Sequence, residues 1–337
     1  MISDRLGVRS SCRAVVASSV YVRINDARVR ELARELITEQ DPPGWDTDLH
    51  YRATGPDGDE RTAMWILVLD ALNFCFWSDD PDQRWRVLWK GELVDGYVAL
   101  VAGLTQAVEA GYPLHDPKWL ANVPESDVAA MLAPAEGHTE IPLFGDRVKN
   151  LRELGQGLLG FGASPATSFI ESADGSAITL VQDIVSTFPS FNDVTVWPYA
   201  ETGLPGNEVR FYKRAQILAG DLAGGLQGSS LSEFHDLDQL TAFADYKVPQ
   251  ILRWLGVMQY DAELAKVVDS HTRIPAGDRM EVEIRAATII ACDRIASEMT
   301  ALGRQTSAAE LDWLLWSRSQ DLSSREHPYH LTETIYY

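Results

Sequence analysis

The sequence has 337 residues, of which 45% are hydrophobic and 23% charged, so it holds enough apolar side chains for a globular core. Twenty-nine basic residues against 49 acidic ones give a formal net charge of −20, and such a surface repels the phosphate backbone of nucleic acids. No apolar run reaches the roughly 20 residues needed to span a bilayer, and the first residues lack the apolar stretch of a secretory signal. We therefore expect a globular protein whose partner is neither a nucleic acid nor a membrane.

The cysteine and histidine patterns match no common disulfide framework or metal site. The three cysteines, Cys12, Cys75 and Cys292, are far apart and form no CxxC pair, and the seven histidines are scattered. The sequence also lacks a GxxxxGK[ST] loop, a GxGxxG that opens a βαβ unit, HExxH and GxSxG. We expect a cytoplasmic protein that uses no metal and no other cofactor.

Helical periodicity dominates the chain. At 29–37 apolar residues recur every three to four positions, as on one face of an amphipathic helix. Residues 63–76 are apolar on nearly every side, which predicts a helix buried in the middle of the fold. Further helices are predicted, in chain order, over residues 93–110, 126–132, 146–159, 176–187, 208–222, 237–244, 249–255, 280–299 and 308–316.

Strand signals are sparse. Residues 194–197 alternate weakly, and the β-branched and aromatic residues of 331–337 could pair at a sheet edge. No linker rich in Ser or Gly, no block of charge and no fixed-period repeat divides the chain. The expected fold class is all-α or nearly all-α, in one compact helical unit.

Four dense polar-aromatic strings stand out, and we expect them to line one pocket. They are NFCFWSDD at 73–80, FPSFND at 188–193, FYKRAQ at 211–216 and FADYKVPQ at 243–250. On the predicted helix Asn73, Phe76 and Trp77 share one face, so an amide beside two rings could grip a flat heterocycle. Core packing is the alternative interpretation of these rings.

The two ionisable residues of most interest are Lys213 and Asp245. Lys213 falls within the predicted helix 208–222 and either points at a ligand or belongs to a solvated helix face. Asp245 lies just before a helix that we expect to begin at Pro249, where free N–H groups and the positive end of the helix dipole favour an ionised carboxylate. It is either a cap or an ion-pair partner of Lys247, or a carboxylate held beside the pocket for a reaction that develops positive charge.

The four strings together resemble the queuosine salvage protein family, the queuosine 5′-phosphate N-glycosylases. The most specific pieces are NFCFWSDD, FPSFNDV, FYKRAQILAGDL, LTAFADYKVPQILRWLGV and EVEIRAATI. The similarity runs over 24–337, as a single helical nucleotide N-glycosylase domain, with 1–23 as an N-terminal extension. The resemblance implies a fold similar to the helical DNA glycosylases, and release of queuine, a 7-deazaguanine base, from queuosine 5′-monophosphate to leave ribose 5-phosphate, in queuine salvage for tRNA modification. It also implies that Asp245 is the catalytic aspartate and Lys213 the active-site lysine.

An N-glycosidase must stabilise the positive charge that develops on the sugar as the base departs. An ionised Asp245 next to C1′ can do so electrostatically or can position the attacking water, and the choice between covalent and water attack stays open. A 7-deazapurine carries carbon in place of N7, so help for the leaving base must come at N3, O6 or another edge. Lys213 is a candidate donor or electrostatic clamp, or it orients Asp245.

The strings also suggest how the nucleotide is held. Carboxylates suit the N–H donors of a guanine-like edge, rings suit stacking, and cations suit the 5′-phosphate. Queuine's aminomethyl-cyclopentenediol arm adds a cationic amine, so a further acidic residue should line that end. The candidate substrate-binding residues are Asn73, Phe74, Trp77, Asp79, Phe188, Asp193, Arg214 and Lys247.

Two other functions are open to the same residues. A noncatalytic carrier of a modified nucleobase or nucleotide would use the same aromatic cage but would need no carboxylate at the glycosidic carbon, so Asp245→Asn separates it from an enzyme. A helix-hairpin-helix DNA repair glycosylase would need a basic face, which the net charge of −20 opposes. The sequence does not indicate the oligomeric state.

Overall fold

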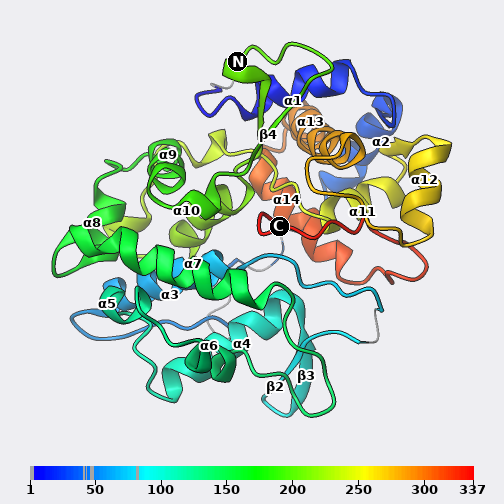
Figure 1. Ribbon diagram of the computed structural model, residues 1–337. Coiled ribbons are helices and arrows are strands. Elements are labelled where there is room, and N and C mark those ends of the chain that lie inside the picture. Colours follow the sequence, from blue (N-terminus) through cyan, green and yellow to red (C-terminus); the bar gives the residue numbers. More distant parts are fainter. Residues whose placement is uncertain (1–3, 41, 43, 46–48, 81–82) are drawn as a thin grey trace.

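The chain folds into a predominantly helical molecule with small strand pairs, as Figure 1 shows. The computed structural model describes residues 4–40, 42, 44–45, 49–80 and 83–337. Its α-helices are α1 (Val8–Ala17), α2 (Asp26–Leu36), α3 (Gly58–Leu72), α4 (Gly96–Glu109), α5 (Pro117–Leu120), α6 (Glu125–Met131), α7 (Phe144–Leu158), α8 (Pro165–Glu171), α9 (Ala177–Thr187), α10 (Lys213–Gly225), α11 (Lys247–Trp254), α12 (Ala262–Asp269), α13 (Arg279–Ala301) and α14 (Ala308–Ser319). This confirms the nearly all-α fold class. Among the described residues, no helix has the length and apolar character that crossing a bilayer requires.

Antiparallel strand pairs join one pair of segments that are distant in the chain and two pairs that are close. The pairs are β1 (Val22–Ile24) with β6 (Met258–Tyr260), β2 (Arg86–Trp89) with β3 (Glu92–Asp95), and β4 (Val194–Val196) with β5 (Glu208–Arg210). Short 3₁₀ turns are η1 (Leu159–Phe161), η2 (Pro189–Phe191), η3 (Pro205–Asn207), η4 (Ser230–Ser232) and η5 (Leu237–Gln239). β4 confirms the strand signal at 194–197, whereas in the predicted edge segment 331–337 the pairing is limited to one bridge, between Leu331 and Arg273.

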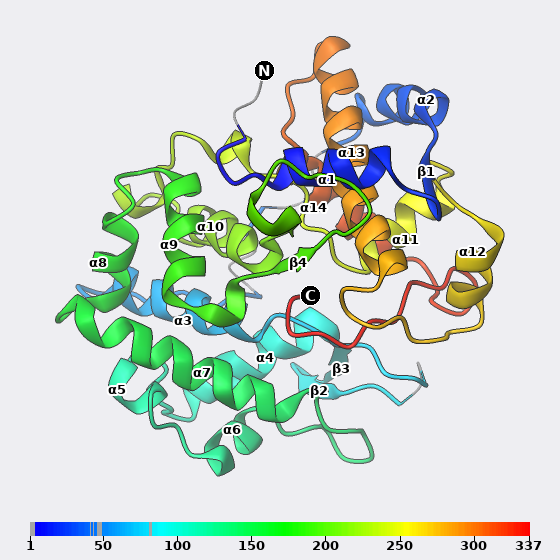
Figure 2. The same cartoon turned by 45° about the horizontal axis from the view of Figure 1, so that its top comes forward.

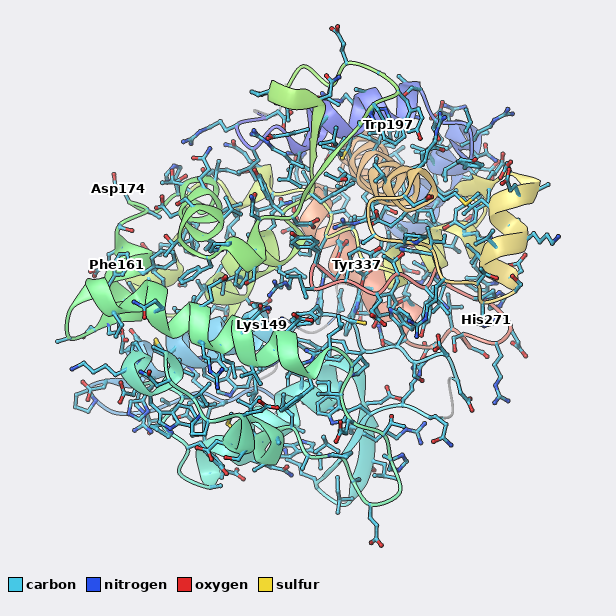
Figure 3. All side chains as sticks on the ribbon, in the orientation of Figure 1. Lys149, Phe161, Asp174, Trp197, His271 and Tyr337 are labelled. Carbon is cyan, nitrogen blue, oxygen red and sulfur yellow. The ribbon has the colours of Figure 1, made fainter. Side chains whose placement is uncertain are left out.

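Two hydrophobic cores organise the helices. The first surrounds α3, which is buried from Thr62 to Leu72 because it is apolar on nearly all sides and packs against α4, α7, α8 and α10. The second surrounds α13, which packs against α1, α2, α11 and α14. Figure 2 shows α3 and α13 in different halves of the molecule, with the last residues of the chain between them, and Figure 3 places Tyr337 near the middle and Asp174 at the rim.

The predicted helix 63–76 is wrong beyond Leu72, where α3 ends. The last carbonyl groups of α3 have no partner within the helix, and they accept hydrogen bonds from the guanidinium groups of Arg147 and Arg214, which come from α7 and α10. The chain then leaves the helix axis, and Cys75 has a left-handed φ of 44°. The helix face predicted to be shared by Asn73, Phe76 and Trp77 therefore does not form, because all three residues lie beyond the end of α3.

Other predicted helices have wrong boundaries for equally specific reasons. Residues 208–210 pair with β4, so α10 begins only at Lys213. In the segment 237–244, only the first three residues form a turn, because the Thr241 N–H donates to the Gln216 side chain, at 2.8 Å, instead of to a helical carbonyl. The expected start of the helix at residue 93 falls within the β2–β3 hairpin, and the helix expected from residue 249 begins two residues earlier, as α11.

Candidate functional site

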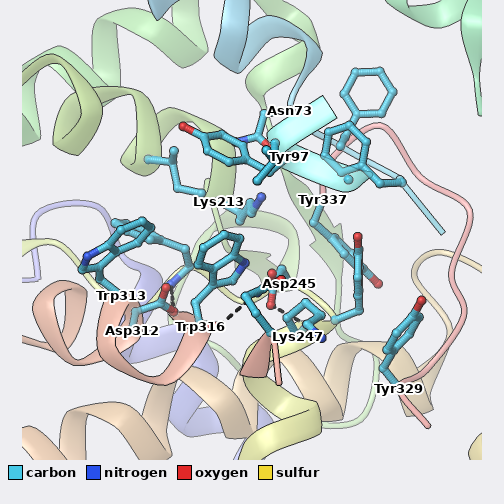
Figure 4. A pocket seen from close by; sticks show the side chains of 18 of the residues that line it. Asn73, Tyr97, Lys213, Asp245, Lys247, Asp312, Trp313, Trp316, Tyr329 and Tyr337 are labelled. Atoms are coloured by element: carbon cyan, nitrogen blue, oxygen red, sulfur yellow. Dashed lines mark hydrogen bonds between the residues drawn. The ribbon is translucent and has the colours of Figure 1, made fainter. Parts of the chain in front are cut away.

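A cavity of about 160 Å³ lies where the two cores meet. The first core contributes the segment after α3, the start of α4 and one face of α10, and the second contributes the residues before α11 and one face of α14. Figure 4 shows Lys213 and Asp245 facing the same space, with Trp313 and Trp316 on one side and Tyr329 on the other. The lining residues that the chemistry below uses are Asn73, Arg84, Tyr97, Lys213, Ile217, Asp221, Asp245, Lys247, Asp312, Trp313, Trp316 and Tyr329.

Asp245 caps α11 with one carboxylate oxygen and turns the other toward the cavity. Oδ1 accepts hydrogen bonds from the backbone N–H groups of Lys247, at 2.8 Å, and Val248, at 2.9 Å. Oδ2 has no hydrogen-bond partner among the residues that the structure describes, and the residue is only 7% exposed. Asp245 is therefore both the helix cap and a carboxylate available to a ligand, two roles that the sequence presented as alternatives.

The charge of Asp245 is balanced by opposing effects. Burial raises the pKa of its carboxyl group, whereas the Lys213 ammonium and the two N–H donors lower it. The sequence predicted the effect of the donors and a possible pairing with a lysine but not the effect of burial, because the depth of burial depends on how α14 and α10 cover the site. A cation beside Asp245 is consequently part of what keeps the carboxylate ionised.

Lys213 is the first residue of α10, and its backbone is anchored from outside the helix. The preceding residue, Tyr212, has a left-handed φ of 49°, and the Lys213 N–H donates to Asp193 Oδ2 at 3.3 Å. Asp193 is itself held by the guanidinium of Arg285, whose Nη1 donates to Oδ1 at 2.9 Å. This arrangement fixes the direction in which the Lys213 side chain enters the cavity.

The Lys213 ammonium group is buried and available. The residue is 6% exposed, and within the described part of the chain Nζ makes no hydrogen bond. Burial lowers the pKa of the ammonium group, and the carboxyl groups of Asp245 and Asp70 oppose that shift. Lys213 is therefore a desolvated cation between acidic groups, which suits binding or protonating a substrate atom.

Asp70 lies directly behind the cavity wall, and the sequence interpretation missed it. It is fully buried on α3, its Oδ1 accepts a hydrogen bond from Asn73 Nδ2 at 3.2 Å, and its Oδ2 has no partner in the described chain. Burial raises its pKa to about 7, against the lowering effects of Asn73, Lys213 and Arg214. The sequence held a signal for it, because Asp70 is the one ionisable residue in the apolar run 62–72. A carboxyl group in a buried helix is rare unless it has a partner or a function.

An aromatic and acidic wall comes from α14 and α4. The Trp313 and Trp316 rings stack with centroids 5.3 Å apart, and Tyr97 meets Trp316 edge-on at 6.0 Å. Asp312 accepts the Phe243 N–H at 2.9 Å, and burial raises the pKa of its carboxyl group well above the ordinary value. No residue of this helix was predicted for the site, although an aspartate among its leucines was a usable signal.

The opposite end of the cavity is cationic. Arg84 donates to the Tyr329 hydroxyl at 2.9 Å, and its Nη1 lies 3.9 Å from Asp95 Oδ2. The Lys247 ammonium donates to the Ser319 carbonyl at 2.8 Å. Burial lowers the pKa of Lys247 to about 8; the Asp245 carboxylate opposes this shift and Arg84 adds to it. These two cations form a region that suits an anion.

Two of the candidate substrate-binding residues hold the site from behind and do not line the cavity. Arg214 is buried and donates to the carbonyl groups of Asp70, at 3.0 Å, and Ala71, at 2.9 Å. Asp193 is 3% exposed and is bonded to Arg285 and to the N-terminus of α10. Both residues therefore orient the elements that carry Asn73 and Lys213.

Three further candidates lie away from the cavity. Phe188 is fully buried against Phe169, with ring centroids 5.4 Å apart. Trp77 is buried in a small cluster with the C-terminal segment. Asp79 is exposed and ion-paired with Arg273 at 2.6 Å. Of the candidate substrate-binding residues, those that line the cavity are Asn73, Phe74 and Lys247.

The comparisons with known proteins agree with the strings of the sequence. A sequence profile described as queuosine salvage protein matches residues 49–337. The chain is similar to proteins named queuosine 5′-phosphate N-glycosylase/hydrolase: it is 43% identical to that of Sphaerobacter thermophilus, over 99% of this chain and 98% of the relative. It is 36% identical to that of Nematostella vectensis, over 82% of each chain, and 32% identical to that of Bos taurus, over 98% of each. The chain therefore belongs to the queuosine salvage protein family.

Proposed function

We propose that this protein hydrolyses the N-glycosidic bond of queuosine 5′-phosphate and releases queuine and ribose 5-phosphate. The relatives' name supports this reaction. The structural observation that carries it is the Asp245 carboxylate, of which one oxygen is fixed by two backbone N–H groups while the other faces a cavity beside a buried ammonium group. A simple binding site for a neutral heterocycle has no need of such a carboxylate.

The chemistry follows from where charge develops. The bond between C1′ and the base nitrogen breaks, and its electron pair leaves with the base, so the ribose becomes an oxocarbenium-like cation. Asp245 Oδ2, partly removed from water, stabilises that cation more strongly than a solvated carboxylate would. The oxygen of a water molecule bonds to C1′, one of its protons stays on the new hydroxyl group, and the other balances the proton taken up by the base.

Lys213 serves the same step in two ways. Its ammonium group lowers the pKa of Asp245 and so helps to keep that carboxylate ionised. Its Nζ is also free of hydrogen bonds to the described residues, so it can donate to the leaving base or to the ribose. The ordinary amine of an exposed lysine would hold its proton more tightly than this buried one does.

The 5′-phosphate belongs at the cationic end of the cavity. Figure 4 shows Lys247 and Tyr329 on the far side of Asp245 from the tryptophans of α14. Arg84, which donates to the Tyr329 hydroxyl, has a buried Nε without a partner in the described chain. A phosphate between these residues would accept charge-assisted hydrogen bonds. The net charge of −20 and the internal location of these two cations favour a free nucleotide over an intact RNA as substrate. We place the reaction in the cytoplasm.

The decisive experiment incubates the purified protein with queuosine 5′-phosphate and follows queuine and ribose 5-phosphate by mass spectrometry. Equal amounts of the two products are expected, and the unphosphorylated nucleoside should react more slowly. Retention of the intact nucleotide, with binding but no release of base, would refute the hydrolase and favour a carrier. Asp245→Asn serves as the inactive reference.

A further inference from the structure

The cavity holds an acidic group that the proposed reaction does not use. Asp221, on α10, lines the cavity but forms no hydrogen bond and no ion pair with the described residues. Other lining carboxyl groups have partners, since Asp245 accepts two N–H donors, Asp312 accepts one and Asp95 lies near Arg84. A partly enclosed carboxyl group without a partner is costly, which points to a ligand that supplies one.

The position of Asp221 relative to the reacting bond follows from the helix. Lys213, Ile217 and Asp221 are spaced by four residues, so they lie on one face of α10, and all three line the cavity. Eight residues of α-helix separate Lys213 and Asp221 by about 12 Å along the axis. A base whose glycosidic bond lies at Asp245, beside Lys213, therefore directs its far edge and the substituent on that edge toward Asp221.

Aromatic rings complete this end of the cavity. Tyr97 and Asp221 both line the cavity, and the Asp221 carboxyl contributes to raising the pKa of the Tyr97 hydroxyl. The Tyr97 ring meets Trp316 edge-on at 6.0 Å. Asp312, on the same wall, is only 5% exposed, and its Oδ2 has no hydrogen-bond partner in the described chain. Ring faces together with carboxyl groups are the environment that binds organic ammonium ions.

We propose that Asp221, with the rings of Tyr97 and Trp316, binds a cationic amine substituent on the base and so makes the enzyme selective for amine-bearing 7-deazaguanine nucleotides. The inference rests on the proposed function, because it takes the secondary amine of queuine's side arm as the cation. The ionisable groups that interact electrostatically with Asp221 are Asp70, Tyr97 and Lys213. Burial and the Asp70 carboxyl raise the Asp221 pKa while Lys213 lowers it, and a bound ammonium group would favour the ionised form.

The test measures binding of free bases and needs no turnover. Queuine and 7-deazaguanine, which has the same ring system without the amine arm, are titrated by calorimetry into the wild type and Asp221→Asn. Loss of one charge-assisted contact should weaken queuine binding roughly ten- to hundredfold and leave 7-deazaguanine within about twofold. Asp174→Asn, at an exposed position far from the cavity, is the matched control and should change neither affinity.

A second readout separates recognition from a structural role. If Asp221 ionises when the protonated amine binds, its carboxyl group releases a proton to the buffer, and the heat of queuine binding to the wild type depends on the ionisation enthalpy of the buffer. Asp221→Asn should lose that dependence, and 7-deazaguanine should never show it. Equal weakening of both bases, or queuine binding that is unchanged in Asp221→Asn, would overturn the proposal.

The two proposals fail in different ways. If the wild type cleaves queuosine 5′-phosphate but treats 7-deazaguanosine 5′-phosphate equally well, the amine site is refuted and the hydrolase stands. If it cleaves neither nucleotide, the hydrolase is refuted, and the base titrations still decide whether Asp221 binds the amine.

Discussion

Replacement of Asp245 by asparagine tests the proposed reaction most directly, because it removes the charge and little else. The amide oxygen of Asp245→Asn can still accept the N–H groups of Lys247 and Val248 that define the start of α11. Asparagine caps helices about as well as aspartate does. Burial raises the pKa of the native carboxyl group, so the neutral amide brings no new desolvation cost, and the variant should fold normally.

The expected loss of activity follows from the electrostatics of the site. Asp245 is 7% exposed, so the effective dielectric constant is closer to about 20 than to that of water, and two unit charges about 4 Å apart then interact by about 4 kcal/mol. Without that interaction the developing sugar cation loses its partner. We expect kcat to fall roughly a thousandfold, whereas the Kd for the intact nucleotide, whose ribose is uncharged, should change by less than about tenfold.

The assay is single-turnover release of queuine from queuosine 5′-phosphate, with nucleotide binding measured separately. A urea unfolding curve for Asp245→Asn shows whether its stability matches that of the wild type. The electrostatic argument is refuted if the folded variant keeps more than about a tenth of the wild-type rate. It is also refuted if catalysis and nucleotide binding decline by the same factor, since the carboxylate would then act on the ground state alone.

Further outcomes follow from the same structure. Activity should be highest when Asp245 is ionised and Lys213 is protonated. The acid limb of the pH–rate profile should lie above the ordinary aspartate pKa and the basic limb below the ordinary lysine pKa, because burial raises the first pKa and lowers the second; limbs at ordinary values would contradict this. Lys213→Met should move the acid limb to higher pH, as the cation that lowers the pKa of Asp245 is lost, and an unmoved limb in a kcat/KM profile would refute the coupling. Asp70 has a pKa of about 7 in the folded protein and about 4 in the unfolded chain, so its favourable contribution to stability, present at low pH, is lost as pH rises toward 7. The urea midpoint of Asp70→Asn should therefore rise relative to that of the wild type between pH 5 and pH 8. Gly155→Ala should lower the free energy of unfolding by about 1–3 kcal/mol, because its Cβ would lie 2.6 Å from the Pro117 carbonyl oxygen, whereas Gly145→Ala on the same helix meets no atom within 4 Å and should not destabilise.

Local chemistry explains what could be predicted from the residue order. Periodic apolar residues predicted helices close to α2, α6, α9, α13 and α14, since one turn of helix is specified by neighbours in the chain. The strings that contain Lys213 and Asp245 were visible for the same reason. Errors arose where a distant group competes for the backbone: Arg214 and Arg147 take the last carbonyl groups of α3, and Gln216 takes the Thr241 N–H.

Composition, periodicity and the four strings thus determined a nearly all-α chain of this family and pointed to an aspartate and a lysine. Only the tertiary structure decided what surrounds them. It turns Asp193 and Arg214 away from the cavity to anchor α10 and α3, and it brings Asp221 and α14 to the cavity wall. The reason is physical: the hydrogen bonds and the burial of a side chain depend on elements that come into contact only when the two cores pack together. These contacts cannot be read from the order of residues within one segment.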